Sequence, residues 1–383
     1  MEWELTSEQR ALRDMVREFA EGKLKPGAAK RDESGEFPWD EVRELQQMGL
    51  FGLIFPSEYG GGGRDLLSFV LAIEELARCD ASVTITLLAH TLCTTHINLF
   101  ASPAQKDRFL GPLVSGRKLG AWALTEPDAG SNAGGIKTVA ASESQGWRLS
   151  GKKYFITNGS KADTLVIMAL TDAERQAKGI SAFVVPGDTP GLARGKNLDK
   201  LGFRSSDTTA LMLKDLVLPR DALLGEMHQG FYQAMQVLDT GRIGVAAMAI
   251  GIARACLEDS LAYMRKRNAF GKPIGEFQAV QWMVADMATE LDAARLLVHR
   301  AAVLRDLGRP FRREASMAKL FSSEAATRAA LKAVQIHGGY GYTKAFPVER
   351  YLREAKLCEI GEGTSEIQRM VISRDLLKEE GVS

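Results

Sequence analysis

The chain has 383 residues, of which 45% are hydrophobic, so it is long enough for two or three domains that share a large buried core. Its 49 basic and 48 acidic residues give a net charge of +1. This balance supplies no general attraction for nucleic acid or for an anionic membrane, so we expect neither as a partner. Any anionic ligand must be held by local groups.

The amino-terminal sequence, MEWELTSEQR, lacks the basic flank and the apolar run of a secretory signal. The four cysteines, Cys79, Cys93, Cys256 and Cys358, do not have the spacing of a disulfide framework, which suits a reducing compartment. Cys93 and His96 can share a helix face, but two ligands do not make a zinc site and no partner pair follows. We therefore expect a cytoplasmic protein without a metal site.

The first third of the chain has the pattern of helices. Ser7 can cap a helix over residues 10–21, and residues 67–78 repeat apolar side chains at helical spacing. The longest apolar stretch, residues 81–93, is too short to span a bilayer and contains His90. This stretch therefore predicts a buried helix.

Residues 119–225 have a different texture, with short β-rich runs separated by turn residues. The runs are AWALT, GWRLSG, KKYFIT, TLVIMAL, ISAFVVPG and TALMLKDLVL. They are typical of an antiparallel barrel or sandwich. Strands and helices do not alternate, and no G-x-G-x-x-G follows a strand, so a Rossmann domain is not expected.

Long helices return after residue 225. One apolar stripe, with alternating spacings of four and three, consists of Val280, Val284, Met287, Leu291, Ala294, Val298 and Ala301. Its helix should end at Gly308, a second helix should run from Arg312 to the glycines of HGGYG, and an earlier one should cover residues 242–267. The order of helices, strands and helices predicts an α+β fold, predominantly α, with a β-domain lodged against two halves of a bundle.

A lone acid, Glu362, lies between Gly361 and Gly363, just before a helix start near Thr364. An acid between glycines is usually a turn residue, because glycine tolerates positive φ. Acids also favour helix N-termini, so Glu362 can be a cap. The residues of this stretch alone favour the cap.

Six motifs together resemble the acyl-CoA dehydrogenase family, from about residue 5 to residue 375. They are WALTEPDAGSNAGGIKT, KKYFITNG, LDTGRIGVAA, RNAFGKPIGEFQAVQ, QIHGGYGY and IGEGTSEIQR, in the family's order. The resemblance is to the bacterial short-to-medium-chain members. It implies an N-terminal helical domain (residues 1–118), a middle β-barrel or sandwich domain (119–225) and a C-terminal four-helix bundle domain (226–383).

The resemblance also implies a function. Members are FAD-dependent enzymes of fatty acid β-oxidation, usually homotetramers built as dimers of dimers, that introduce a trans α,β double bond into an acyl-CoA thioester. Their electrons pass to an electron-transferring flavoprotein. Glu362 matches the base that removes the α-proton, while hydride leaves the β-carbon for flavin N5.

Several other positions match the substrate site of the family. Some members place the base at the position of Gly241, which here cannot act as an acid. The resemblance implies that Asp239 approaches the CoA moiety, that Arg242 lies at the substrate end, and that Gly363 contacts substrate. The alternative for Asp239 and Arg242 is a charge pair at a helix start. Many relatives have tyrosine in place of Gly361, so its small size suggests room for a longer or branched acyl chain.

Two strand-rich segments match the flavin ring site. The first contributes Trp122, Leu124, Thr125 and Ser131, the last shared with CoA, and the second contributes Phe155, Ile156 and Thr157, whose hydroxyl would face N5. Two alternatives remain open: TEPDAGS can be any surface loop, and Phe155 can be a core residue. Asp128 replaces the glycine common in this loop, which leaves its backbone angle open.

The remaining matches concern the adenine and pyrophosphate parts of FAD. They are Arg267 for phosphate, Phe270 for stacking, Gln278, then Gln335, Gly338 and Gly339 from a neighbouring subunit, and finally Thr364 and Glu366. The glycines of HGGYG can equally form a helix C-cap, and Glu366 can belong to a capping pattern.

Two rival functions follow from the same residues. An acyl-CoA oxidase uses the same base and flavin but passes electrons to oxygen, and motifs do not report oxygen access. A family-like flavoprotein with a nucleic-acid-binding role would need a basic face, against which the balanced charge argues.

Overall fold

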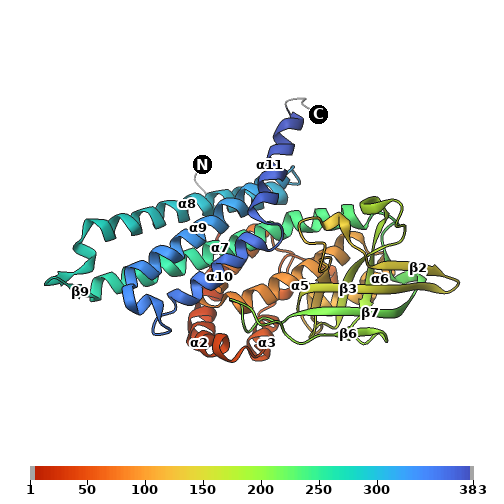
Figure 1. Ribbon diagram of the computed structural model, residues 1–383, viewed down its shortest axis with the longest axis horizontal. Coiled ribbons are helices and arrows are strands. Elements are labelled where there is room, and N and C mark those ends of the chain that lie inside the picture. Colours follow the sequence, from red (N-terminus) through yellow and green to blue (C-terminus); the bar gives the residue numbers. More distant parts are fainter. Residues whose placement is uncertain (1–4, 380–383) are drawn as a thin grey trace.

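A computed structural model describes residues 5–379, and its first third is helical (Figure 1). The helices are α1 (Ser7–Phe19), α2 (Lys25–Ser34), α3 (Trp39–Gln47), α4 (Leu66–Cys79), α5 (Ala81–Phe100) and α6 (Pro103–Val114). The predicted cap of α1 is wrong by one residue. Thr6, not Ser7, accepts the amide of Gln9, and the Gln9 side chain returns to the Thr6 amide in a capping box.

Helix α5 is longer than its predicted stretch because the polar residues that follow Cys93 continue the helix. Two described helices, α5 and α7 (Gly230–Lys266), are long and apolar enough to cross a membrane by length and composition alone. The most apolar windows of both are mostly buried within the fold, at 67% and 78%. The prediction of a buried helix is confirmed, whereas the prediction that the segment is too short to span a bilayer is wrong.

One eight-stranded sheet follows the helices. Its strands are β1 (Gly120–Ala123), β2 (Val139–Glu143), β3 (Gly146–Thr157), β4 (Thr164–Leu170), β5 (Ile180–Pro186), β6 (Leu192–Arg194), β7 (Thr208–Pro219) and β8 (Leu223–Leu224). The order is β6-β7-β3-β2-β4-β5-β8, with β1 beside β4. Most pairings are antiparallel as expected, but β4 pairs in parallel with β1 and, at one position, with β2.

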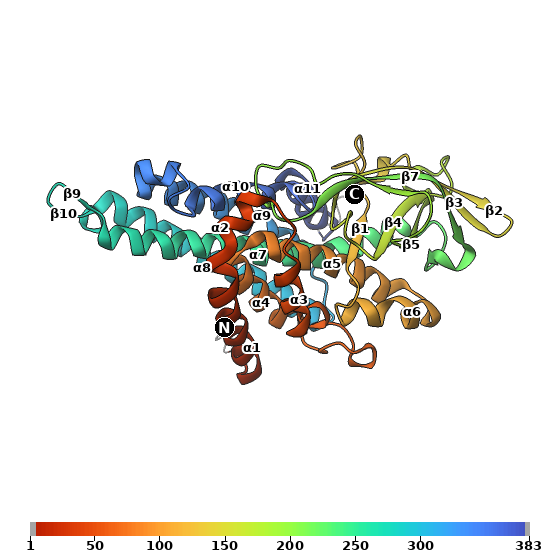
Figure 2. The ribbon, with the colours of Figure 1, turned by 90° about the horizontal axis from the view of Figure 1, so that it is seen from below.

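The two faces of β4 and β5 pack against different partners. Val166 and Val184 belong to a cluster with residues of α5 and α6, whereas Ile167 and Phe183 belong to a second cluster with Leu211 of β7. Alternate strand residues therefore bury one face against helices and the other against the rest of the sheet. Figure 2 shows the sheet at one end of the molecule, with α6 beside it.

The C-terminal part is a bundle of long helices that extends away from the sheet (Figures 1 and 2). After α7 come β9 (Asn268–Ala269), β10 (Lys272–Pro273), α8 (Gln278–Asp306), α9 (Arg312–His337), α10 (Val348–Ile360) and α11 (Ser365–Glu379). The predicted stripe on α8 is buried from Met287 to Ala301 and partly buried at Val280 and Val284. Helix α7 begins at Gly230, twelve residues before the predicted start, so Asp239 and Arg242 lie inside it.

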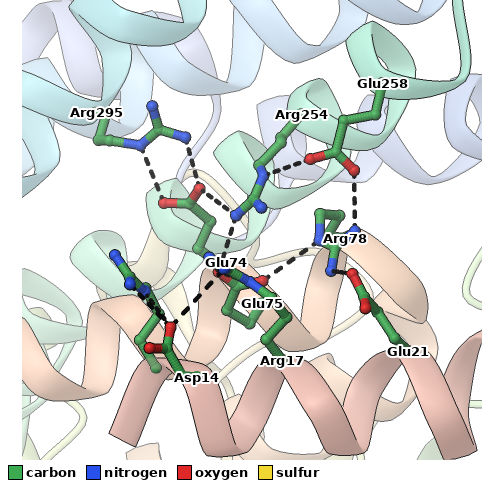
Figure 3. A network of polar contacts seen from close by, with 10 residues as sticks. Asp14, Arg17, Glu21, Glu74, Glu75, Arg78, Arg254, Glu258 and Arg295 are labelled. Atoms are coloured by element: carbon green, nitrogen blue, oxygen red, sulfur yellow. Dashed lines mark hydrogen bonds and ion pairs between the residues drawn. The ribbon is translucent and has the colours of Figure 1, made fainter. Parts of the chain in front are cut away.

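A network of buried charges joins the N-terminal helices to the bundle (Figure 3). The carboxylates of Glu74 and Glu75 on α4 lie within 3.3 Å and 2.9 Å of the Arg254 guanidinium on α7. Arg17 of α1 also pairs with Glu75 at 2.8 Å, and Arg295 of α8 pairs with Glu74 at 2.7 Å. Because each buried carboxylate has more than one cation, the network satisfies charges that burial alone would destabilise.

Replacing Arg254 with methionine should lower the free energy of unfolding by about 2–3 kcal/mol, because the two buried glutamates lose charged hydrogen bonds. Urea unfolding measures the effect. Arg43→Met is the control, since Arg43 pairs with Asp40 on the exposed surface and such pairs contribute only about 0–1 kcal/mol. Equal losses of stability in the two variants would contradict a stabilising role for the network.

Candidate active site

Glu362 lies in the short connection between α10 and α11. It has a left-handed backbone, with φ of +53°, which is uncommon for a residue with a side chain. Its Oε2 atom is buried and accepts no hydrogen bond from the residues that the structure describes. The cap of α11 is instead Thr364, whose hydroxyl accepts the Ile367 amide at 3.4 Å. The interpretation of Glu362 as a helix cap is therefore wrong.

Gly241 on α7 faces the Glu362 carboxylate. A Cβ atom at position 241 would lie 2.1 Å from Oε2 of Glu362 and 2.7 Å from Cδ2 of Leu92 on α5. Only glycine leaves space for the carboxylate at this point. A side chain at position 241 would therefore compete with the Glu362 carboxylate for the same space.

Burial raises the pKa of Glu362 to about 7, and the nearby cations Lys319 and Arg242 oppose this rise. Arg242 is itself engaged, since it donates to the Asp239 carboxylate at 2.6 Å. The alternative interpretation of Asp239 and Arg242 as a charge pair is thus confirmed, although the pair lies inside α7 and not at its start. A carboxyl group with a pKa near 7 is suited to taking and returning a proton at neutral pH.

The two predicted flavin segments lie together at the ends of β1 and β3. The Tyr154 amide donates to the Thr125 carbonyl at 2.8 Å, and the buried Lys153 ammonium donates to the Leu124 carbonyl at 3.0 Å. Lys153 also pairs with the Glu126 carboxylate at 2.8 Å. The start of this loop is therefore anchored from inside the sheet. The alternative of a surface loop holds for the rest of it, where the exposed residues are Pro127, Asp128, Gly130 and Ser131.

Phe155 does not belong to the core. Its side chain is 61% exposed and its φ is +58°, whereas the neighbouring Ile156 is 2% exposed. The core interpretation of Phe155 is wrong, because the left-handed backbone turns the ring outward. Ile156 can reach a ligand only through its backbone. Asp128 has no positive φ, and its carboxylate pairs with Lys137 at 3.0 Å.

Helix α5 brings the β1 segment close to Glu362. The Trp122 indole donates to Nδ1 of His96 at 3.1 Å, and Leu92, four residues earlier, lies against Gly241 and the Glu362 carboxylate. Residues four apart share one helix face and are separated by about one turn, roughly 5–6 Å. The β1 segment and the α10–α11 connection are therefore near enough for one ligand to contact both.

The other predicted cofactor residues lie elsewhere. Arg267, Phe270, Gln278, Gln335, Gly338 and Gly339 are all exposed, and β9, beside Arg267, is at the end of the bundle remote from the sheet (Figure 1). The Arg267 guanidinium lies 5.8 Å from the Tyr340 ring centre. Gly338 has φ of +57° and is the C-cap of α9, as the alternative expected. One chain therefore does not bring these residues to Glu362.

The last predicted contacts follow the base. Glu366 is exposed, and the pKa of its carboxyl group is lowered by hydrogen bonds from its own amide and from the Thr364 hydroxyl. The alternative interpretation of Glu366 as part of a capping pattern thus fits its hydrogen bond with Thr364. Ser131 is exposed in the loop after β1.

Sequence reasoning missed four buried residues that support this site: His96 as a partner of Trp122, Lys153, Lys319 and Gln368. Lys319 on α9 donates to the Gly363 carbonyl at 2.6 Å, and Gln368 on α11 donates to the same oxygen at 3.0 Å. A lysine or a glutamine within a helix usually faces water. Its burial depends on distant elements, so no local spacing could have revealed these contacts.

Three family models match the chain: the acyl-CoA dehydrogenase N-terminal domain over residues 6–117, the middle domain over 121–216 and the C-terminal domain over 228–377. A short-chain specific acyl-CoA dehydrogenase of Clostridium acetobutylicum is 46% identical, over 99% of this chain and 100% of the relative. The structure of butyryl-CoA dehydrogenase from Megasphaera elsdenii has a TM-score of 0.97 at 44% identity, over 98% of this chain and 100% of that chain.

A third similarity is to a chain in a structure described as an electron transferring flavoprotein of Acidaminococcus fermentans. It has a TM-score of 0.97 at 44% identity and covers 99% of this chain and 100% of that chain. The domain matches occur in the predicted order, and the named relatives align along their whole length. The chain is therefore an oxidoreductase that belongs to the acyl-CoA dehydrogenase family.

Proposed function

We propose that the chain dehydrogenates a short acyl-CoA thioester to the trans-2-enoyl-CoA, with Glu362 as the base. The observation that carries this proposal is the buried, unpartnered Oε2 of Glu362, which lies against Gly241. A buried acceptor without a donor is costly to a protein and calls for a functional reason. The short-chain specific and butyryl-CoA relatives support the substrate class.

We assign the removal of the α-proton to Glu362. In its ionised form it removes the α-proton of the thioester, and the arriving acyl chain excludes water from the carboxylate. The raised pKa means that the carboxylate holds the proton readily until product leaves. The amide of Glu362 can donate to the thioester carbonyl and stabilise the charge that develops there.

The residues of the β-domain fit a flavin ring. Phe155 presents an exposed ring beside the anchored Thr125 loop, and an aromatic side chain with a strained, outward backbone fits a planar ligand. Trp122, Leu124, Thr125 and Thr157 would hold the ring edges. When bound, FAD supplies the acceptor for the β-hydride of the substrate.

The adenosine half of FAD would be held by a second copy of the chain. Arg267 and Gly338 are exposed at the far end of the bundle, and no atom lies within 4 Å of a Cβ placed at Gly338 or Gly339. This open backbone leaves room for a pyrophosphate group. We infer a homotetramer in which each FAD lies between two subunits, and an electron-transferring flavoprotein as the electron acceptor.

Gly361 bears on the length of the acyl chain. Only Leu357 atoms lie within 4 Å of a Cβ placed at Gly361, so no bulky residue closes the space beside it. This supports the acceptance of chains longer than butyryl or branched near the thioester. A preference for butyryl-CoA alone across a chain-length series would contradict this part of the proposal.

The test uses the purified yellow protein under anaerobic conditions. Butyryl-CoA and its longer and branched analogues should bleach the flavin absorbance, and the product should be the trans-2-enoyl-CoA. Turnover should require an electron-transferring flavoprotein, with little activity when oxygen is the only acceptor. Rapid turnover with oxygen would instead favour an acyl-CoA oxidase, and no bleaching with any thioester would overturn the proposed function.

A further inference from the structure

The backbone that follows the Cα atom of the base is held by two buried side chains. Lys319 and Gln368 are both 0% exposed. The Lys319 ammonium donates to the Gly363 carbonyl at 2.6 Å, while the Gln368 amide donates to the carbonyls of Glu362 and Gly363 at 3.2 Å and 3.0 Å. Two different helices, α9 and α11, therefore hold one peptide segment.

This segment has an unfavourable backbone conformation. Glu362 has φ of +53° and Gly363 has φ of +98°, so two consecutive residues are left-handed. A left-handed residue with a side chain costs roughly 1–3 kcal/mol and persists only where the surroundings determine it. The hydrogen bonds from Lys319 and Gln368 are contacts of this kind, and they set the direction in which the Glu362 side chain leaves the backbone.

Lys319 contrasts with the other fully buried lysine. Lys153 contacts the carboxylate of Glu126 at 2.8 Å, so its charge is neutralised in place. Within the described residues, Lys319 has no carboxylate within ion-pair distance, and its one hydrogen-bond acceptor is the Gly363 carbonyl. A buried ammonium without a paired carboxylate is costly to stability. The buried position of Lys319 therefore lowers the stability of the core, and a role in the active site explains it better.

Several charged or titratable groups surround this position. Arg242 and its partner Asp239 face the base from α7, while Cys358 and Glu359 face Lys319 from α10. Burial lowers the pKa of Lys319 to about 8, so the ammonium is mostly charged at neutral pH. Its charge holds the pKa of Glu362 below the value that burial alone would give.

We propose that Lys319 is a positioning residue for the base, which fixes the backbone at Gly363 and favours the ionised form of Glu362. This inference rests on the proposed function of Glu362. Lys319 does not touch the thioester; it acts through the segment that carries the carboxylate.

The test compares three substitutions at one position, each assayed as the FAD-loaded enzyme with butyryl-CoA. Lys319→Met removes donor and charge, Lys319→Gln keeps a donor without charge, and Lys319→Arg keeps both. Lys319→Met should lower kcat by about 10- to 100-fold with little change in KM, because misplacement of a catalytic group by about 1 Å costs roughly 100-fold. The acid limb of its pH–kcat/KM profile should move to higher pH, and Lys319→Arg should restore that limb.

Ser323→Ala is the matched control, because Ser323 is buried one turn later on α9 and donates only to the Leu320 carbonyl of its own helix. It should leave both kcat and the pH profile unchanged. If Lys319→Met does not fold, a shift of the acid limb to higher pH in Lys319→Gln supports the same role for Lys319. An unchanged limb and kcat in folded Lys319→Gln would overturn the inference.

A double variant separates this inference from the proposed function. If Lys319 acts through the base, adding Lys319→Gln to Glu362→Gln should reduce the residual rate no further. A further tenfold loss in the double variant would show that Lys319 acts independently of Glu362. If Glu362→Gln alone retained full activity, the proposed function would fail whatever Lys319 does.

Discussion

Glu362→Gln is expected to lower kcat with butyryl-CoA by about 10²- to 10⁴-fold, the range typical of a lost general base. Glutamine has nearly the same shape, so binding of the flavin and of the acyl-CoA should remain close to normal. The measurement combines steady-state turnover with titration of the flavin spectrum by the thioester. The expected result is a protein that binds its substrate and does not oxidise it.

Glu143→Gln is the control for this prediction. Glu143 lies on β2 in the sheet, and its carboxylate forms a partly exposed pair with Arg148 of β3 at 2.5 Å. Its loss should change turnover little. Near-normal turnover in Glu362→Gln would refute the assignment of the base, and equal losses in both variants would point to a general structural effect.

Gly241→Ala is expected to reduce turnover by roughly 100-fold, because the new methyl group would occupy the place of the Glu362 carboxylate. A Cβ at this position lies 2.1 Å from Oε2, so the carboxylate must move. Alanine has the higher helix propensity, which partly offsets the contact of the new methyl group with Cδ2 of Leu92 at 2.7 Å. Activity should therefore fall while the midpoint of thermal unfolding changes by only a few degrees.

Gly244→Ala provides the comparison on the same helix. A Cβ at Gly244 would lie 2.8 Å from Cδ2 of Leu88, a flexible apolar side chain of α5, and would meet no carboxylate. Gly244→Ala should cost some packing energy and leave turnover close to that of the natural protein. If the two alanine variants lost activity equally, close packing between α5 and α7 would explain both effects and the role of Gly241 would be excluded.

Local pattern predicted much of the fold. The stripe from Val280 to Ala301 predicted helix α8 and its buried face, because apolar spacing of three and four directly reports one side of a helix. The start of α7 was missed because Gly230 and Gly241 reduce helix propensity, whereas packing against neighbouring helices overrides it. The parallel pairing of β1 with β4 depends on contacts between distant residues, which no local pattern encodes.

The candidate site could be predicted only in part. Glu362 and Phe155 were recognised through motifs, but the outward ring of Phe155 depends on a left-handed backbone that composition does not reveal. The roles of Lys319 and Lys153 depend on the burial of their side chains. The sequence does not show this burial, because most lysines are exposed. Residues that touch ligand can thus be found by resemblance, whereas those that support them require the three-dimensional arrangement.

The contact between Trp122 and His96 belongs to a longer chain of hydrogen bonds. His96 joins Gln233 of α7 through Nε2 at 3.1 Å, and the Gln233 amide donates to the Leu224 carbonyl at 3.1 Å. Burial lowers the pKa of His96 to about 4, so its ring is neutral near pH 7 and carries a single proton, on Nε2. Each hydrogen bond in this chain then has a fixed donor and a fixed acceptor. The donors all point in one direction, from β1 through α5 and α7 to β8.

This relay ties the β-domain to α5 and α7 at one level of the molecule. The strand that begins the loop at Thr125 and the helix that carries Gly241 share a common anchor in α5. A rotation of the β-domain relative to the bundle would have to break these hydrogen bonds. The relay therefore opposes such a rotation and favours one fixed placement of Trp122 relative to the helix that carries Gly241.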